Sequence, residues 1–147
     1  MKELANTTLS EVMLRNLVVI KPVDTLDKAA EAFKLYPFHH LPVVDDDMIL
    51  VGMLSSTDME RESHGGSLFK HHMKVQHDDA LFRTLLVREV MVDAVFRLSP
   101  GHTIADAYDA FKKGRFRAIP IVEDGVLVGL ITPLDLIRYL LEDQVEQ

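Results

Sequence analysis

The sequence predicts an α+β fold of two βαββα repeats that pack sheet to sheet with pseudo-twofold symmetry. Three observations predict it: an internal duplication, the same order of apolar runs and helical patterns in both copies, and the small size of one copy. The chain has 147 residues, and one copy of about 50 residues buries too little surface to form a core alone. Two copies packed together would bury both sheets and create equivalent clefts between the halves, where ligands commonly bind.

The duplication emerges when the sequence is aligned with itself. At an offset of 78 residues, Glu11-Val12-Met13 falls on Glu89-Val90-Met91. The first copy has one extra residue near Asp46, so the offset then becomes 77. At this second offset, Leu50-Val51-Gly52 matches Leu127-Val128-Gly129. So many ordered matches with a single gap indicate a repeat of one unit. The sequence thus divides into a first repeat at 1–62, an inserted segment at 63–87 and a second repeat at 88–147.

Each repeat begins with a predicted strand and a predicted helix. The strands are the short apolar runs Leu17–Ile20 and Val95–Leu98, each ended near a proline. Thr25 and Thr103 are candidate N-caps for the helices that follow. Helical spacing is found at Leu26, Ala29, Ala30 and Phe33 in the first copy and at Ile104, Ala107, Ala110 and Phe111 in the second.

A hairpin and a closing helix complete each repeat. The predicted hairpin strands are Leu41–Val44 with Ile49–Leu54, and Ile119–Val122 with Val126–Ile131. The closing helices begin near Ser55 and near Thr132. In the inserted segment, a helix is expected within Ser67–Leu86, with its apolar side at Ala80, Leu81, Leu85 and Leu86.

Composition excludes several classes of protein. Apolar residues make up 48% and charged residues 27%, as in ordinary globular proteins. Without cysteine there is neither a disulfide framework nor thiolate chemistry. The net charge of −7 argues against duplex nucleic acid as a partner. No apolar run approaches the roughly 20 residues that span a bilayer, and the N-terminus lacks a signal-peptide pattern, so we expect a cytoplasmic protein.

The sharpest motif lies at the junction between the last strand and the closing helix. It reads Gly52-Met53-Leu54-Ser55-Ser56-Thr57-Asp58 in the first copy and Gly129-Leu130-Ile131-Thr132-Pro133-Leu134-Asp135 in the second. Ser/Thr-x-x-Asp is typical of a helix cap. A helix N-terminus also offers amide donors to an anion, and a carboxylate can accept from the two hydroxyls of a ribose. Capping and binding of a ribose-phosphate group are both compatible with this pattern.

With the duplication, these motifs resemble a tandem pair of cystathionine-β-synthase (CBS) domains, the Bateman module, over residues 9–62 and 88–141. In that family the apolar-Pro pair and the Gly-apolar-apolar-Ser/Thr-x-x-Asp motif form an adenosine site. The resemblance implies that Asp58 and Asp135 bind ribose hydroxyls and that Ser55 and Thr132 contact ribose or phosphate. It also implies that the chain around Leu41-Pro42 and Ile119-Pro120 holds the adenine ring.

The resemblance implies further pocket residues at the first strands and before each proline. The first strands would contribute Val18, Val19 and Ile20 in one copy and Val95, Phe96 and Arg97 in the other. Cationic residues that face phosphate are expected just before each apolar-Pro pair. At these positions the chain has His39 and His40 in the first copy, and Arg117 and Ala118 in the second. Ala118 departs from the cationic pattern. Histidine binds phosphate better when protonated, so we expect tighter binding of phosphorylated ligands towards pH 6.

The resemblance implies a regulatory sensor of an adenine nucleotide, without a catalytic cofactor or catalysis of its own. AMP, ADP, ATP and S-adenosylmethionine all share the adenosine part, and no Walker loop, dinucleotide fingerprint or nucleophile elbow is present. A homodimer is implied, and a separate effector protein is expected because no enzyme or transporter domain is attached. His64, His71, His72 and His77 fit no metal-site template and are interpreted as a solvated linker.

The alternative is a structural or interaction module without a ligand. Its motifs would only cap helices, and its terminal helix would dock a partner. The residues that could serve this role, unless they belong to the core, are Ile137, Tyr139, Leu140 and Leu141.

Overall fold

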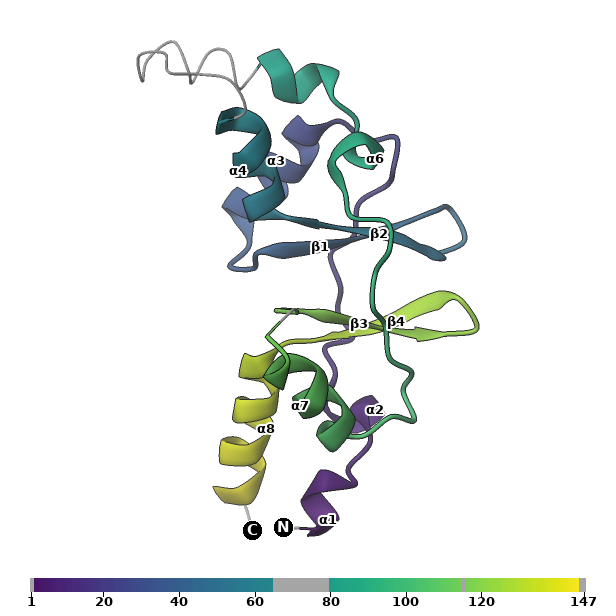
Figure 1. Cartoon of the computed structure of the whole chain (residues 1–147), viewed down its shortest axis with the longest axis vertical. Coiled ribbons are helices and arrows are strands. Elements are labelled where there is room, and N and C mark those ends of the chain that lie inside the picture. The colour runs from purple at the N-terminus through teal and green to yellow at the C-terminus, as the bar shows by residue number, and fades with distance from the viewer. Residues whose placement is uncertain (1, 65–79, 115, 146–147) are drawn as a thin grey trace. The chain divides into compact units, whose positions relative to one another are not determined.

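The computed structural model describes residues 2–64, 80–114 and 116–145. It contains two compact units (Figure 1). Unit 1 consists of Met1–Leu17 and Phe96–Gln147, and unit 2 of Val18–Val95. Each unit is described separately below.

Each unit contains a helix, a hairpin and a closing helix in that order, together with one or more short helical segments. Unit 2 contains α3 (Leu26–Leu35), β1 (His40–Val44), β2 (Leu50–Ser55), α4 (Ser56–His64), a helical turn over 80–84 and α6 (Val87–Val90). Unit 1 contains α1 (Lys2–Ala5), α2 (Leu9–Val12), α7 (Ile104–Lys112), β3 (Ile119–Glu123), β4 (Val126–Ile131) and α8 (Pro133–Val145). The predicted sequence of helix, hairpin and closing helix is therefore confirmed in both repeats.

The predicted first strands are shorter than expected. Each is reduced to one parallel bridge, Ile20 with Val43 and Leu98 with Ile121. The Ile20 N–H donates to the Pro42 carbonyl, and the Val44 N–H donates to the Ile20 carbonyl. A longer parallel ladder would next need the N–H groups of Pro42 and Pro22, which proline lacks. Pro120 and Pro100 block the ladder beside Leu98 in the same way.

The hairpins differ mainly in their turns. Each carries a bulge, between Val43 and Val44 in one and between Ile121 and Val122 in the other. The β3–β4 turn places Asp124 at φ 53° and Gly125 at φ 83°, the signs that a two-residue type I′ turn requires. The segment between Val44 and Leu50 is one residue longer than the equivalent segment between Val122 and Leu127, and it has its positive φ at Met48, 63°.

The compact units divide the chain differently from the sequence repeats. The leading segment of the first repeat, residues 1–17 with α2, packs in unit 1 with the core of the second repeat. Correspondingly, α6 packs in unit 2 with the core of the first repeat. The extended residue after each short helix pairs with the outer edge of a hairpin, Leu14 with Leu130 and Val92 with Met53. Each unit thus combines one repeat's helices and hairpin with the other repeat's leading segment.

Glycines in β2 and β4 make this packing possible. A Cβ at Gly129 would overlap the side chain of Met13, and a Cβ at Gly52 would overlap that of Met91. The repeated methionine therefore lies directly over the repeated glycine. The motif glycines are required for close packing within each unit.

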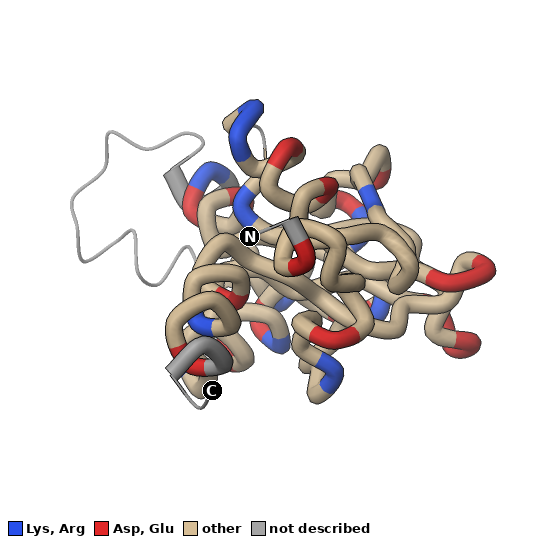
Figure 2. The backbone as a smooth tube through the Cα atoms, turned by 90° about the horizontal axis from the view of Figure 1, so that it is seen from below, with Lys and Arg blue, Asp and Glu red and all other residues tan. Residues whose placement is uncertain are grey.

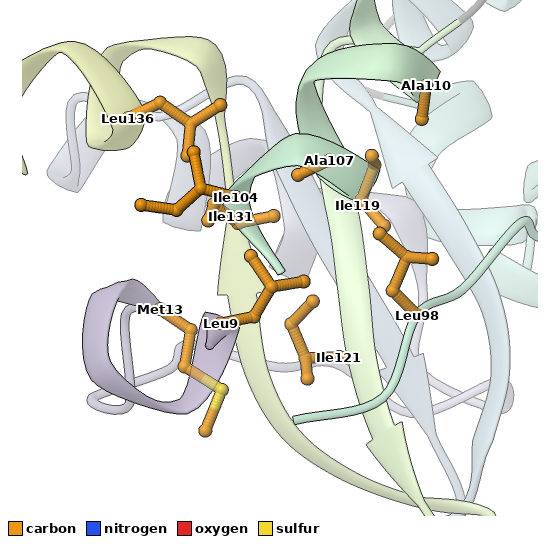
Figure 3. Packing of buried hydrophobic residues seen from close by; sticks show 10 residues of the cluster. All are labelled: Leu9, Met13, Leu98, Ile104, Ala107, Ala110, Ile119, Ile121, Ile131 and Leu136. Atoms are coloured by element: carbon orange, nitrogen blue, oxygen red, sulfur yellow. The ribbon is translucent and has the colours of Figure 1, made fainter. Parts of the chain in front are cut away.

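The core of unit 1 lies where these elements meet. Figure 3 shows side chains from α2, α7, β3, β4 and α8 directed toward one another. The buried members are Leu9, Met13, Leu98, Ile104, Ala107, Ala110, Ile119, Ile121, Ile131 and Leu136. The corresponding core of unit 2 consists of Ile20, Leu26, Ala29, Leu41, Val43, Leu54, Met59 and Val87. The helical apolar positions expected in the two repeats accordingly face these cores, fully buried or packed against them.

Part of the inserted segment also packs on unit 2. Leu85 packs against its core, as expected, and so does Phe82, which was not among the expected residues, whereas Ala80 is exposed. The remainder of the expected helix, residues 67–79, lies outside the described residues. Among the described helices, none is both long and apolar enough to cross a membrane.

Acidic residues gather at the hairpin turns (Figure 2). Asp46 and Asp47 are exposed in the β1–β2 loop, and Glu123 and Asp124 are exposed in the β3–β4 turn. Lys21 bridges to Asp46 at 3.2 Å and donates to the Asp45 carbonyl at 2.9 Å, so one cation anchors the longer loop.

Candidate functional site

The two strand–helix junctions carry reciprocal hydrogen bonds. In unit 2, the Ser55 N–H donates to Asp58 Oδ2 at 3.1 Å and the Asp58 N–H donates to Ser55 Oγ at 3.0 Å. In unit 1, the Thr132 N–H and hydroxyl donate to Asp135 Oδ2 at 2.8 and 2.9 Å, and the Asp135 N–H returns a bond to Thr132 Oγ1 at 3.3 Å. Both motifs are therefore helix caps, which confirms the capping interpretation and leaves ligand binding open.

The second oxygen of each capping carboxylate faces an arginine. Asp58 Oδ1 lies 3.8 Å from Arg61, and Asp135 Oδ1 lies 3.3 Å from Arg138. The carboxylate side chains are 14% and 13% exposed, whereas the arginines are 76% and 51% exposed. An exposed ion pair is weak, so a ligand hydroxyl can replace the arginine at Oδ1 without breaking the cap.

Arg61 and Arg138 are equivalent in the repeat, at the offset of 77 residues, but neither is among the expected site residues. The available signal was their position three residues after each capping aspartate, because residues i and i+3 are neighbours on a helix.

In unit 2, two histidines lie beside the junction. His40 pairs with Ser55 across the hairpin. The Ser56 N–H donates to the His39 carbonyl at 2.9 Å, and Ser56 Oγ lies 3.5 Å from His39 Nδ1. The structure therefore brings together Ser55, Asp58 and the two histidines that the sequence proposed for phosphate.

In unit 1, the corresponding place has an aromatic pair and an arginine. Ile119 pairs with Ile131, the residue before Thr132, so Ala118 and Arg117 lead into the junction. Arg117 is exposed and Ala118 is buried. The Phe96 ring stacks on Phe116 with centroids 4.6 Å apart and planes at 19°. Phe116 was absent from the expected site, although its repeat match with Phe38 was a signal.

The apolar residues proposed to hold adenine are buried. Leu41, Pro42, Ile119 and Pro120 are fully enclosed, and Ile20 is 3% exposed. Their side chains belong to the hydrophobic interior, so a ligand at the observed surface would meet their backbone. The adenine contacts stay a prediction.

The remaining proposed residues lie at the surface or near it. Val18 and Val19 are half-buried in unit 2, and Phe96 and Arg97 are exposed in unit 1. Val95 is half-buried and belongs to unit 2, so the expected group Val95–Arg97 is divided between the units.

Other features are separate from these junctions. A surface hollow of about 350 Å³ in unit 2 is lined by α3 and the 80–84 turn, and no proposed site residue lines it. Within residues 2–64, 80–114 and 116–145, no group of three or more His, Asp or Glu residues could hold a metal ion. His71, His72 and His77 lie outside these ranges, and the side chain of His64 is not described either.

The fold and its junctions define a class of protein, a tandem repeat of two small α+β units with a capped strand–helix junction in each. The family model of the CBS domain matches residues 9–65 and 87–142. The chain belongs to the CBS domain family and contains a tandem CBS pair.

Several known proteins are similar over nearly the whole chain. The chain is 28% identical to protein MJ1225 of Methanocaldococcus jannaschii, with 94% of this chain and 44% of the relative covered. It is 28% identical to the chloroplastic CBS domain-containing protein CBSX1 of Arabidopsis thaliana, with 92% and 64% covered. The chain thus spans about half the length of these curated relatives.

A solved structure shows the same architecture. The crystal structure of the CBS-pair protein CBSX2 from Arabidopsis thaliana is 25% identical, with a TM-score of 0.80 over 95% of this chain and 98% of that chain. CBSX2 has also been solved in complex with AMP, and that structure matches with a TM-score of 0.76 over 92% and 97% of the two chains.

Proposed function

We propose that this CBS pair binds an adenosine-type ligand at its strand–helix junctions and acts as a regulatory module without catalysis of its own. The observation that carries the proposal is the pair of capping carboxylates, Asp58 and Asp135. Each uses one oxygen for the helix cap and offers the other to an exposed arginine. A ribose diol supplies two donors that suit such an oxygen. The complex of the similar CBSX2 with AMP supports this choice of ligand class.

The residues around the carboxylates suggest how the remainder of the ligand binds. In unit 2, His39 and His40 lie beside Ser55 and are proposed to face phosphate. In unit 1, Arg117 is proposed to take that role, because a guanidinium is suited to phosphate. The adenine ring would contact the backbone near Pro42 or Pro120, because the proline side chains are buried.

A stability measurement tests the proposal. Thermal unfolding is followed with AMP, ADP, ATP and S-adenosylmethionine, because a ligand at one hundred times its dissociation constant adds about 2.7 kcal/mol to the native state. Asp58→Asn and Asp135→Asn are the test variants, since an amide oxygen can still accept the capping N–H. Asp106→Asn is the matched control, because Asp106 caps α7 by the same kind of bond.

The expected result is a raised midpoint with at least one ligand and loss of that rise in one junction variant. The Asp106→Asn protein should keep the full rise. If none of the four ligands shifts the midpoint, or if all three variants respond equally, the junctions only cap helices.

The pH dependence of binding separates the two junctions. Phosphorylated ligands should bind unit 2 more tightly at pH 6 than at pH 8, because histidines gain positive charge in that range. Replacement of His39 and His40 by Gln should remove the difference. Titration curves that overlay at the two pH values would contradict the role of the histidines.

A specific observation favours a second role, self-association through α8. Leu134, Ile137 and Leu141 are 60%, 51% and 64% exposed and lie on one stripe of the helix. By contrast, Leu136 is buried and Tyr139 packs against the core. Of the residues expected to dock a partner, Ile137 and Leu141 are therefore exposed on this stripe. Leu134 is exposed as well, although it was not among the expected residues. We propose that this stripe pairs with a second copy to form a homodimer.

Sedimentation velocity tests the homodimer. Ile137→Glu with Leu141→Glu should give monomers, whereas Glu142→Gln on the same helix should not. A monomeric wild-type protein would refute self-association and leave the ligand proposal untouched, while a dimer that ignores all ligands would favour the interaction-module alternative.

A further inference from the structure

Two equivalent turns hold the leading segments of the repeats. The 21–25 turn precedes α3 in unit 2, and the 99–103 turn precedes α7 in unit 1. In unit 2, the Val87 N–H donates to the Asp24 carbonyl at 2.8 Å and the Arg88 N–H donates to the Pro22 carbonyl at 3.0 Å. In unit 1, the Leu9 N–H donates to the His102 carbonyl at 2.7 Å and the Ser10 N–H donates to the Pro100 carbonyl at 3.1 Å.

A third backbone bond completes each attachment. The Leu26 N–H donates to the Leu85 carbonyl at 3.0 Å, and the Ile104 N–H donates to the Thr7 carbonyl at 2.9 Å. The geometry of the two turns must therefore be kept for the leading segments to stay in place.

Different side chains close the two turns. In the 21–25 turn, the Lys21 N–H donates to Asp24 Oδ2 at 2.8 Å. In the 99–103 turn, the Ser99 N–H donates to His102 Nδ1 at 2.9 Å, with Ser99 Oγ 2.8 Å from the same nitrogen. The repeat thus places a carboxylate in one turn and an imidazole at the equivalent position of the other.

The two acceptors respond differently to acid. A carboxylate keeps its lone pairs throughout the neutral range, whereas an imidazole nitrogen accepts a hydrogen bond only while it carries no proton. Histidine side chains gain their proton between pH 8 and pH 5. A proton on His102 Nδ1 can be donated to Ser99 Oγ, but the Ser99 N–H then loses its acceptor and faces another donor.

Charged groups around His102 act on this equilibrium. Asp106 on α7 interacts electrostatically with His102, and its carboxylate would attract an imidazolium. Other charged residues on the packed elements include Glu3 on α1, Glu11 on α2, and Asp109 and Lys112 on α7. Arg15, just after α2, donates to the Ser10 carbonyl at 2.7 Å and to Ser10 Oγ at 2.9 Å.

We propose that the 99–103 turn is a pH-sensitive clasp for residues 7–10, and that the 21–25 turn is its pH-insensitive counterpart. Protonation of His102 weakens the turn and loosens residues 7–10 from unit 1. Unit 2 keeps its leading segment over the same range. The chain therefore holds both the switch and its own internal control.

Amide hydrogen exchange measured by NMR tests the clasp. Protection factors, corrected for the intrinsic exchange rate, are measured for Leu9 and Ser10 and for Val87 and Arg88 at several values between pH 8 and pH 5.5. The first pair should lose about two- to tenfold protection on acidification, the range expected for one net hydrogen bond. The second pair should change by less than twofold.

Two variants decide whether His102 is responsible. His102→Asp copies the side chain of the other turn, and His102→Asn provides a neutral oxygen acceptor without repulsion from Asp106. Either variant should hold the protection of Leu9 and Ser10 constant between pH 8 and pH 5.5. In the wild-type protein, the amide proton of Ser99 should shift together with the ring signals of His102.

Three results would overturn the proposal. They are equal loss of protection in both pairs, an unchanged loss in the His102 variants, and a Ser99 amide signal that does not follow His102. Ligand-free protein is used throughout, so the outcome is independent of nucleotide binding.

Discussion

Units 1 and 2 follow the same backbone plan but differ in the polar side chains that complete it. Both have a hairpin flanked by single bridges, a methionine over a glycine and a capped closing helix. In unit 1, however, the Thr103 hydroxyl accepts the Asp106 N–H at the start of α7, whereas Thr25 makes no such bond at the start of α3. Position 106 is an aspartate, and its repeat equivalent is Lys28.

The comparison shows which features the architecture requires. Prolines limit the parallel ladders, and buried aliphatic residues fill both cores. Glycines in β2 and β4 leave room for the methionine side chains that pack on them. Caps, turn closures and aromatic pairs vary without changing the backbone, because each contributes only about 1 kcal/mol. Divergence between the copies is therefore concentrated in polar residues near the surface, where binding properties are also decided.

The largest expected effect tests the exchange of leading segments. Leu9 and Val87 are equivalent, and both are completely buried. Leu9→Ala should cost about 2–5 kcal/mol, and the loss of exchange protection should fall on α7 and β3 in unit 1. Mass spectrometry of deuterated peptides measures this distribution. Leu14→Ala is the control, because Leu14 is 45% exposed. Loss centred on α3 and β1 would show that residues 1–17 pack with the first repeat.

The next effect concerns the glycine under each methionine. Gly129→Ala should cost about 1–3 kcal/mol through overpacking, as measured by urea unfolding. Met13→Ala combined with Gly129→Ala should cost less than the sum of the single changes, since the overlap is removed.

Gly101→Ala provides the control for that pair of residues. A Cβ at Gly101 would meet no atom within 4 Å, so this change should leave the free energy of unfolding nearly unaltered. Equal losses at Gly101 and Gly129 would contradict the role assigned to Met13.

A smaller effect distinguishes the two helix starts. Thr103→Ala should destabilise unit 1 by about 1 kcal/mol, because it removes an N-cap. Thr25→Ala should cost less than half of that, since Thr25 gives α3 no side-chain cap bond. Urea unfolding of both variants measures the difference, and equal losses would mean that the caps do not distinguish the units.

The smallest expected effect is a change in the free energy of unfolding with pH. The pKa of Asp106 lies below its ordinary value, mainly because the Thr103 N–H donates to its carboxylate. Desolvation raises the pKa, whereas the Thr103 hydroxyl and His102 lower it further. A lowered pKa stabilises the fold above the unfolded pKa of about 3.9 and loses that contribution as pH falls through the folded pKa.

Asp106→Asn should therefore destabilise the protein at pH 5 and lose this disadvantage toward pH 2. Urea unfolding across this range measures the change. Asp109→Asn, an exposed position on the same helix, is the control, and a constant difference between wild type and Asp106→Asn would contradict the role of the charge.

Much of the architecture could be predicted from the sequence because the duplication displays each local signal twice. Hairpins, helix faces and the junction caps follow from paired apolar runs of strand length, helical spacing and the Ser/Thr-x-x-Asp pattern. The short first strands were also predictable in principle, since Pro22 and Pro42 remove the N–H groups on both sides of Ile20. That interpretation requires the register of the bridge, which the sequence alone does not provide.

The exchange of leading segments could not be predicted. Leu9 and Val87 occupy equivalent positions near the start of similar repeats, so either segment suits either unit by pattern alone. Likewise, the sequence indicated a polar site at Asp58 and Asp135 but not the arginines opposite their free oxygens. Those contacts depend on side-chain orientation, which residue spacing only restricts.

The exchange of leading segments also determines the order in which the two units can fold during synthesis. Unit 2 is continuous from Val18 to Val95, so its core can close as soon as that stretch has left the ribosome. Unit 1 needs Leu9 beside Ile104 and Ile131, so the first seventeen residues must wait for the last part of the chain. Domains generally fold as units during synthesis. The second repeat therefore completes a unit whose earlier part, residues 1–17, is synthesised before the whole of unit 2.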